Sequence, residues 1–318
     1  MSEYLKRRIV TLIPVLLGVS FAVFMMLHFL PGDPVMMMLT EHRGGSAPTV
    51  VSGITDEMYA SMRRELGLDR PLAVQFGSFV WGAVQGDLGR SFRTGRPVSQ
   101  VLLRNLPHTV VLAFASLGVA LVVGLAFGII AAVKRDTWLD GTSMTVALFG
   151  VSMPNFWLGI MLLLIFALHL NWLPSISRTG DVRSLILPAF TLGLSGAAII
   201  ARLVRSSLIE VLNQDFIRTA RAKGVPGTLV VLKHALRASL IPVLTIAGLQ
   251  FGNLLGGSVV VEVVFGRPGV GQVLINGIFE RDFPIVQGVV LFVAIAYVFM
   301  NFLVDVTYAW LDPRLSYS

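Results

Sequence analysis

Six long runs without a charged residue constrain this chain more than any other feature. Each run contains at least 18 residues, and a helix needs roughly 20 apolar residues to cross the hydrocarbon core of a bilayer. Only 14% of all residues are charged, well below the roughly 25% typical of soluble domains. The sequence therefore predicts an all-α polytopic membrane protein with six transmembrane helices, at Ile9–Leu30, Val110–Val133, Gly141–Leu168, Ser184–Ala201, Ala238–Val261 and Phe283–Val304.

The first run also resembles a signal peptide, because Lys6, Arg7 and Arg8 precede it. Its apolar stretch is longer than a typical signal-peptide core, and no small-x-small cleavage site follows at Leu30-Pro31. We therefore expect a retained membrane anchor. The fourth run is the shortest, and it extends toward Ser207 if Arg202 and Arg205 snorkel to the interface.

The distribution of basic residues predicts the orientation. With six spans, the termini and two of the loops share one side, which carries thirteen Lys and Arg residues, whereas the short loops on the other side carry four. The positive-inside rule places the basic side, and therefore both termini, in the cytoplasm. Topology thus accounts for the net charge of +7, and nucleic acid is not needed to explain it.

Two connections between the spans contain helix signals. The extracytoplasmic segment of about seventy residues after the first span has a predicted helix start at Thr55, a stop at Gly67 and an apolar helix at Pro71–Val84 that would lie on the membrane surface. We expect an ordered cap without chemistry. In the cytoplasmic stretch Leu208–Arg237, apolar residues recur at helical spacing as far as Ala220. Such an amphipathic helix can lie on lipid, pack under its own bundle or insert into a groove on a partner.

Motifs for chemistry are missing from the sequence. It has no cysteine, no HExxH motif and no P-loop lysine, so we predict no metal site and no cofactor bound by this chain, and any ATP must act on another polypeptide. Ser195 lies in a GxSG pattern seen in intramembrane serine proteases. That chemistry needs a histidine on a neighbouring span, and the two following spans have none.

Polar residues within the spans are candidates for a translocation path, because polar groups in hydrocarbon face a bundle interior or water. Interhelical hydrogen bonds are the more common role for any one of them. Proline and glycine interruptions in the spans favour a conduit that moves over a passive anchor. The path candidates are Asn155, Gln250, Asn253 and Glu262; Gln287, Asn301 and Asp305 are further polar residues of the spans.

At Phe216-Ile-Arg-Thr-Ala-Arg-Ala-Lys-Gly224 the sequence resembles the coupling segment of binding-protein-dependent ABC importer permeases. Arg218-Thr219-Ala220 stands where the family has Glu-Ala-Ala, and Gly224 stands at the family's glycine. Further stretches resemble the B-type subunit of the dipeptide/oligopeptide/nickel subfamily along nearly the whole chain. They are Leu30–Pro34, Gly86–Ser91, Pro154–Gly159, Leu187–Leu192, Arg281–Gln287 and Asp312–Leu315.

This resemblance implies a type I ABC importer permease with a MetI-like bundle in the bacterial inner membrane. It also implies a heterodimer with a homologous C-type permease, two cytoplasmic ATPase subunits that hold ATP and Mg, and an extracytoplasmic substrate-binding protein. Residues 1–95 would form the first helix and the outer segment. Residues 96–318 would form the transporter domain, with a coupling helix at about 208–226.

The resemblance assigns ATPase coupling to Asp215, Phe216, Arg218, Thr219, Ala220, Arg221, Ala222, Lys223 and Gly224. A bulky charged residue at Gly224 is then expected to uncouple transport while the chain still inserts into the membrane. The expected cargo is a di- or oligopeptide, carried by alternating access. Nickel chelates, glutathione and oligosaccharides are alternative cargoes, and an ATPase-independent channel or scaffold is the alternative of a different class.

Overall fold

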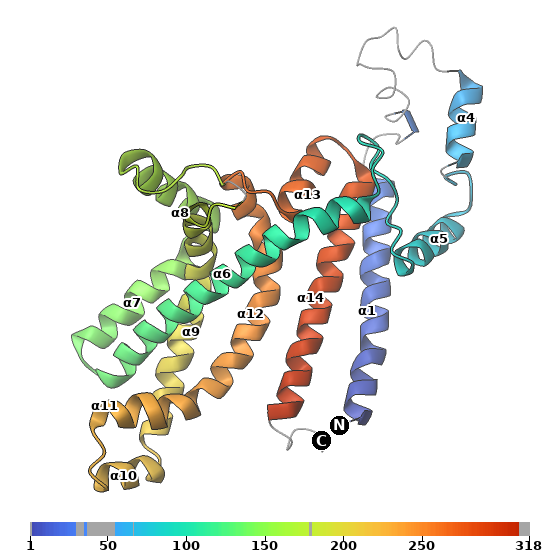
Figure 1. Cartoon of the computed structure of the whole chain (residues 1–318). Helices are drawn as coiled ribbons and strands as arrows, with labels where there is room; N and C mark the ends of the chain where they lie inside the picture. The colour runs from blue at the N-terminus through green and yellow to red at the C-terminus, as the bar shows by residue number, and fades with distance from the viewer. Residues whose placement is uncertain (1, 30–34, 37–54, 66, 178–179, 312–318) are drawn as a thin grey trace. The chain divides into compact units, whose positions relative to one another are not determined.

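The computed structural model of the protein describes residues 2–29, 35–36, 55–65, 67–177 and 180–311 (Figure 1). Every regular element in these ranges is helical, with one isolated β-bridge between Arg90 and Pro97. The motifs at Leu30–Pro34 and Asp312–Leu315 lie outside the described residues, as does most of the segment before Thr55. The helical structure agrees with the predicted fold class.

The helices differ in length and regularity. Two of them, η1 and η2, are short π-helices that continue neighbouring α-helices. In chain order the elements are α1 (Ser2–Phe29), α4 (Asp56–Glu65), α5 (Leu72–Val84), α6 (Val98–Val133), α7 (Trp138–Ser152), α8 (Asn155–Leu162), η1 (Leu163–His169), α9 (Arg183–Leu212), α10 (Asp215–Ala222), α11 (Gly227–Leu229), η2 (Val230–Ala235), α12 (Leu236–Val264), α13 (Val270–Phe279) and α14 (Phe283–Leu311).

Four of the described helical stretches are long and apolar enough to cross a membrane, and a bent pair makes a fifth if it counts as one span. The four are Val98–Val133, Arg183–Leu212, Gly227–Val264 and Phe283–Leu303, whereas α1 has a shorter apolar part at Val10–Met25. The expected count of six spans therefore stays a prediction.

The third predicted span is not one straight helix. Within Gly141–Leu168 the chain bends by 105° between α7 and the α8–η1 segment. Met153 at the bend is extended, with φ −94° and ψ 132°. Proline disfavours helical geometry in the residue before it and has no N–H to donate, so Pro154 is the physical cause of the break.

The residues form two compact units. Unit 1 comprises residues 107–272 and 296–318, and unit 2 comprises residues 2–106 and 273–295. Each unit is described by itself. The predicted division at residues 95 and 96 stays a prediction, because α6 begins at Val98 and contributes to both units.

In unit 1 the long helices pack closely against α9 through small residues. A Cβ atom added at Gly124, Gly128 or Gly193 would collide with the facing helix, and Ala147 of α7 packs with Ala198 and Ala201 of α9. The core continues with apolar residues of α6, α9 and α12. These contacts make α9 the helix on which α6, α7 and α12 are assembled.

Replacing Gly150 with valine is expected to separate α7 from α9. A Cβ atom at Gly150 would lie 2.6 Å from the carbonyl oxygen of Leu194, which is backbone and cannot rotate away. Overpacking of this kind costs about 1–3 kcal/mol, which corresponds to a fall in Tm of roughly 2–10 °C. Thermal unfolding of the detergent-solubilised protein measures it. Gly141→Val on the same helix is the control, because nothing lies within 4 Å of its added Cβ. An equal loss in both variants would contradict the packing account.

Unit 2 confirms several local predictions. The Thr55 hydroxyl oxygen accepts a hydrogen bond from the Met58 N–H at 3.3 Å, as expected for the cap of α4. The predicted helix Pro71–Val84 corresponds to α5. Phe76 of α5 packs against Phe21 and Phe24 of α1, with ring centroids 5.5 Å apart in both pairs. Part of the α5 apolar face is therefore packed on α1, while Trp81 remains 65% exposed.

The loop before α6 is fastened to the turn between α13 and α14 within the same unit. Asp282, which is 3% exposed, accepts hydrogen bonds from the Ser91 hydroxyl and from the Phe92 N–H at 3.1 Å. The exposed Arg93 and Glu280 form an ion pair beside it. The sequence stretches at Gly86–Ser91 and Arg281–Gln287 therefore meet in space.

Candidate functional site

The predicted amphipathic helix at Leu208–Gly224 is divided into two helices. α9 continues without interruption to Leu212, the chain turns at Asn213-Gln214, and α10 begins at Asp215. Gln214 has extended geometry, with φ −76° and ψ 154°. The break shifts the helical phase, so the residue that faces the protein interior is Ile217 rather than Phe216.

Ile217 anchors α10 to the rest of unit 1. Its side chain is fully buried in a cluster with Leu208 and Val211 of α9 and with Val230 of η2. Ala132 at the end of α6 belongs to the same cluster. Burial of an isoleucine side chain stabilises by about 1.5–3 kcal/mol. Together with the half-buried Ala220, which packs against the same cluster, Ile217 holds the short helix against three neighbouring elements.

Gly224 ends α10 in a Schellman motif. Its N–H donates to the Arg221 carbonyl at 2.9 Å, and the Val225 N–H donates to the Ala220 carbonyl at 3.2 Å. The motif needs a left-handed residue after the helix, and Gly224 has φ +77°. An added Cβ would meet nothing within 4 Å, so the requirement for glycine is conformational and not a matter of space.

The predicted coupling residues lie together on α10 and its C-terminal turn. All of them are exposed except Ala220, which is half-buried. Phe216 is 45% exposed, an unusual position for a large aromatic side chain on a polar helix. Arg218 and Asp215 are 3.6 Å apart but highly exposed, and such pairs contribute little to stability. The exposed face thus combines one aromatic side chain with three cations, Arg218, Arg221 and Lys223.

Sequence reasoning missed Ile217, the residue that positions all the others. A helical periodicity that runs without a break from Leu208 predicts Phe216 and Ala220 on the buried face; Ala220 does pack against the buried cluster, whereas Phe216 is exposed. The signal that could have located the break is the polar pair Asn213-Gln214 followed by the acidic Asp215, because polar residues followed by an acidic first turn mark helix starts.

The four path candidates lie in different environments. Asn155 is half-buried at the start of α8, and Asn253 is exposed on α12. Gln250 is 8% exposed and donates from its side-chain amide to the Gly196 carbonyl of α9 at 3.2 Å. In Gln250 the structure shows the more common role of an intramembrane polar residue, an interhelical hydrogen bond.

Glu262 has no exposed surface and closes the turn between α12 and α13. One carboxylate oxygen accepts from the Thr109 hydroxyl at 2.7 Å, and the other accepts from the Gly271 N–H at 2.8 Å and the Gln272 N–H at 3.3 Å. The Thr109 oxygen in turn accepts from the Val270 N–H at 2.9 Å. The carboxylate therefore holds α6, α12 and α13 together, an environment that does not favour a role in lining a path.

The glycine-rich segment Gly266–Gly271 makes room for this carboxylate. A Cβ atom added at Gly269 would overlap the Glu262 carboxylate, and one at Gly271 would overlap the backbone of Val259. Arg267 is 7% exposed and donates to the Ser177 hydroxyl at 3.2 Å. Burial lowers the pKa of the Arg267 guanidinium, and the charge of Glu262 acts in the opposite direction. These glycines serve packing and not phosphate binding.

Replacing Glu262 with alanine is expected to destabilise unit 1. The change leaves the Thr109 hydroxyl and two backbone N–H groups without their acceptors, at about 1–3 kcal/mol for each unsatisfied group. Glu262→Gln keeps one oxygen acceptor and is expected to lose less. Thermal unfolding of the purified protein ranks the two variants, with Glu210→Ala on the exposed face of α9 as the control. If Glu262→Ala unfolds at the same temperature as the control, the carboxylate does not hold the turn.

Within the described ranges, no group of three His, Asp or Glu side chains could hold a metal ion. Ser195 is half-buried, and its hydroxyl donates to the Leu192 carbonyl at 3.0 Å. That bond lies within α9 itself. The candidate functional features of the described residues are therefore the exposed face of α10 and the buried polar contacts of Gln250 and Glu262.

Comparisons with known proteins agree with this picture. The family model described as "Binding-protein-dependent transport system inner membrane component" matches residues 124–317, and its N-terminal companion matches residues 1–113. A putative peptide transport system permease protein of Brucella abortus (strain 2308) is 42% identical over the full length of both chains. The glutathione transport system permease protein GsiC of Escherichia coli (strain K12) is 43% identical, also over both full lengths.

Solved structures support the same fold. An inward-facing crystal form of the MetNI methionine ABC transporter aligns with a TM-score of 0.57 at 21% identity, over 67% of this chain and 97% of that chain. An amino acid ABC transporter solved with histidines aligns at 0.52 and 13% identity, over 66% and 93% of the two chains. The chain belongs to the binding-protein-dependent transport system inner membrane components and is a permease subunit of the peptide-type ABC importers, in which separate subunits hydrolyse ATP.

Proposed function

We propose that this chain forms one half of the translocation path of an importer for di- or oligopeptides, and that α10 is its docking site for an ATPase subunit. One observation carries the proposal: the buried side of α10 is anchored by Ile217, whereas Phe216 is exposed on the surface of the same helix. A buried anchor under an exposed aromatic side chain is what a helix needs to insert into a groove as a rigid body. A helix lying on lipid would instead present its largest apolar residues on one continuous face.

The charge of the exposed face supports this docking. Arg218, Arg221 and Lys223 are exposed on α10 and the turn that follows it, so the partner groove would carry acidic residues at its rim. The positive-inside distribution of basic residues supports a cytoplasmic position for α10 and for both termini. Partner ATPase subunits there would hold ATP and Mg. A homologous C-type permease and an extracytoplasmic binding protein would complete the importer.

The cargo follows from the relatives. The two named above are described as transporting peptides and glutathione, and glutathione is itself a modified tripeptide. A peptide is therefore the substrate class that both share. Glutathione, nickel chelates and oligosaccharides are the alternative cargoes, and each is added as a competitor in the test.

Uptake into proteoliposomes tests the proposed function. The chain is co-expressed with the proposed partner permease, ATPases and binding protein, and the purified complex is reconstituted with ATP inside. We expect ATP-dependent accumulation of labelled di- and tripeptides, reduced by unlabelled peptide but not by nickel chelates or oligosaccharides. Transport without ATP would support the channel alternative, and a chain that purifies without ATPases would support a scaffold.

Asn253 on α12 is the path candidate with an exposed side chain, and Gly256, also exposed, lies one turn further along the same helix. The chain contains no cysteine, so a single Asn253→Cys change gives a unique label site. We expect a water-soluble maleimide to react at this position and substrate to slow the reaction. Val122→Cys, which is 70% exposed on α6, is the comparison site.

A further inference from the structure

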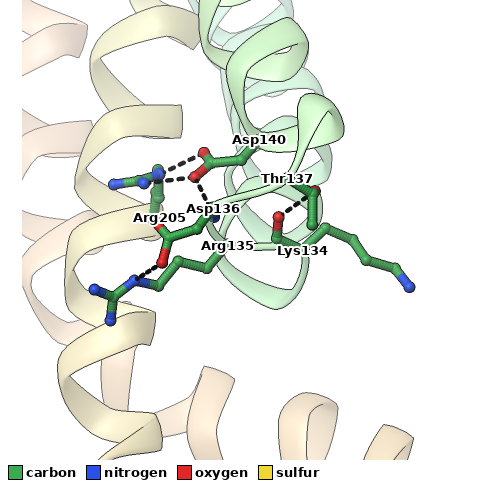
Figure 2. A network of polar contacts seen from close by, with 6 residues as sticks. All are labelled: Lys134, Arg135, Asp136, Thr137, Asp140 and Arg205. Atoms are coloured by element: carbon green, nitrogen blue, oxygen red, sulfur yellow. Dashed lines mark hydrogen bonds and ion pairs between the residues drawn. The ribbon is translucent and has the colours of Figure 1, made fainter.

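Asp140 and Arg205 form the most extensive ion-pair contact in the described part of the chain. The Arg205 guanidinium donates from Nε at 2.7 Å to one Asp140 oxygen and from Nη2 at 2.6 Å to the other (Figure 2). The Asp140 side chain is 9% exposed and that of Arg205 is 31% exposed. Bidentate arginine–carboxylate pairs fix the orientation of both partners as well as binding them. The sequence allowed Arg205 to snorkel to the membrane interface. In the structure its guanidinium is instead bound by the carboxylate of Asp140, 65 residues away.

The same carboxylate fixes the turn between α6 and α7. The Asp136 N–H donates to Asp140 Oδ2 at 3.1 Å, and Asp136 has the left-handed φ of +60°. On the solvent side the Thr137 hydroxyl donates to the Lys134 carbonyl, and Arg135 pairs with the exposed Asp136 carboxylate (Figure 2). The Asp140 side chain, in the first turn of α7, thus binds both the tight turn that precedes α7 and Arg205 of α9.

Arg205 lies close to the anchor of α10. Leu208, one turn further along α9, is fully buried in the cluster that contains Ile217. Ala132 and Ile129, from the last turns of α6, belong to the same cluster. The end of α9, the end of α6 and α10 are consequently packed into one body, and Arg205 reaches out of that body toward α7.

α7 follows α9 closely from Asp140 to its own end. Ala147 packs with Ala198 and Ala201, and Gly150 lies against the Leu194 backbone. The helix ends at Ser152, and the 105° bend at Pro154 follows immediately. No glycine or proline interrupts the packed part of α7 between Gly141 and Gly150. The bend at Pro154 is therefore the first break in the helix after the packed part of α7.

We infer that Asp140 and Arg205 are positioning residues that make α7 move together with α10, so that a displacement of α10 reaches the bend at Pro154. The inference rests on the proposed docking of ATPase subunits at α10. Without the ion pair, α9 and α10 still form one packed body, but the start of α7 is held to that body by apolar contacts alone. ATP hydrolysis would then continue, but less of the displacement of α10 would be transmitted through α7 to the bend at Pro154.

The first test compares transport with ATP hydrolysis in the reconstituted complex. We expect Asp140→Asn to lower transported peptide per ATP by about tenfold, within the range of allosteric coupling between sites, while ATP turnover is retained. The exchange of both charges, Asp140→Arg with Arg205→Asp, is expected to restore part of the ratio. Asp136→Asn is the matched control: it makes the same chemical change in the same turn but removes only an exposed carboxylate.

A proportional fall of transport and ATP turnover, with no recovery in the charge exchange, would overturn the inference.

A second measurement does not depend on whether the variants fold. Spin labels are placed at Trp138→Cys on α7 and at Gln214→Cys just before α10 in this cysteine-free chain, both at exposed positions, within a complex whose other subunits lack cysteine.

The distance between the two labels is compared in the nucleotide-free state and in the ATP-trapped state. If α7 and α10 move as one body, the distance between the labels changes by no more than the ~1–2 Å of an ordinary helix shift. A larger change in the transporting parent complex would show that α7 and α10 move separately, and would refute the inference while leaving the proposed function intact. A parent complex that neither assembles nor transports would refute the proposed function itself.

Discussion

Replacing Phe216 with alanine is expected to abolish most ATP-dependent uptake while leaving the chain folded. The side chain is 45% exposed and its loss opens no cavity in the core. An aromatic residue at the centre of a docking surface typically contributes about 2 kcal/mol or more to binding, which corresponds to roughly 30-fold in affinity for the ATPase subunit. Co-purification of ATPase with the tagged chain and peptide uptake measure the two effects.

Two comparisons make this result specific. Phe149 on α7 is 57% exposed, so Phe149→Ala removes a similar side chain away from α10 and is expected to keep the ATPase bound. Ile217→Ala removes a fully buried neighbour of Phe216 and is expected to destabilise the fold, at about 2–5 kcal/mol for such a truncation. Normal ATPase recovery with Phe216→Ala would show that α10 does not dock through its aromatic side chain.

Replacing Gly224 with glutamate is expected to reduce uptake strongly. The residue has φ +77° and closes the Schellman motif of α10, and a side chain in left-handed geometry costs about 1–2 kcal/mol. The end of α10 would be forced into another conformation, and an acidic charge would be added beside Lys223. Uptake and ATP turnover in proteoliposomes measure the effect.

Gly224→Asn is the matched control, because asparagine tolerates the left-handed region better than other residues with a side chain. It is expected to retain most of the uptake lost in Gly224→Glu. If both variants fail equally, close backbone contact with the partner is the requirement at this position, since no atom of this chain lies within 4 Å of an added Cβ. If both transport normally, Gly224 has no part in coupling.

Local patterns predicted local structure well. Charge-free runs located α6, α9, α12 and α14, Thr55 capped α4 as expected, and α5 formed at Leu72–Val84, whereas the run Gly141–Leu168 is broken at Pro154. The phase of α10 was wrong, because helical periodicity has no signal for a two-residue break such as Asn213-Gln214. An error of one position then exchanged the roles of Phe216 and Ile217.

Contacts between distant segments could not be predicted from the sequence. From the sequence, the fourth run extends toward Ser207 if Arg202 and Arg205 snorkel, yet Arg205 is bound by Asp140, which α7 supplies from 65 residues away. Glu262, directly after the charge-free run Ala238–Val261, is a path candidate from the sequence as a polar residue of the spans, whereas Thr109 and the backbone of α13 bind its carboxylate in the structure. Such pairings depend on how helices pack, which periodicity alone does not determine.

The most direct test of the account is photo-crosslinking from α10 in the assembled complex. A benzoylphenylalanine placed at Phe216 should crosslink to an ATPase subunit, whereas the same residue at Trp81, which is 65% exposed on α5, should not. ATPase adducts from position 216 alone would establish both the docking surface and the side of the membrane on which it lies. Lipid adducts from position 216, or ATPase adducts from position 81, would contradict the account.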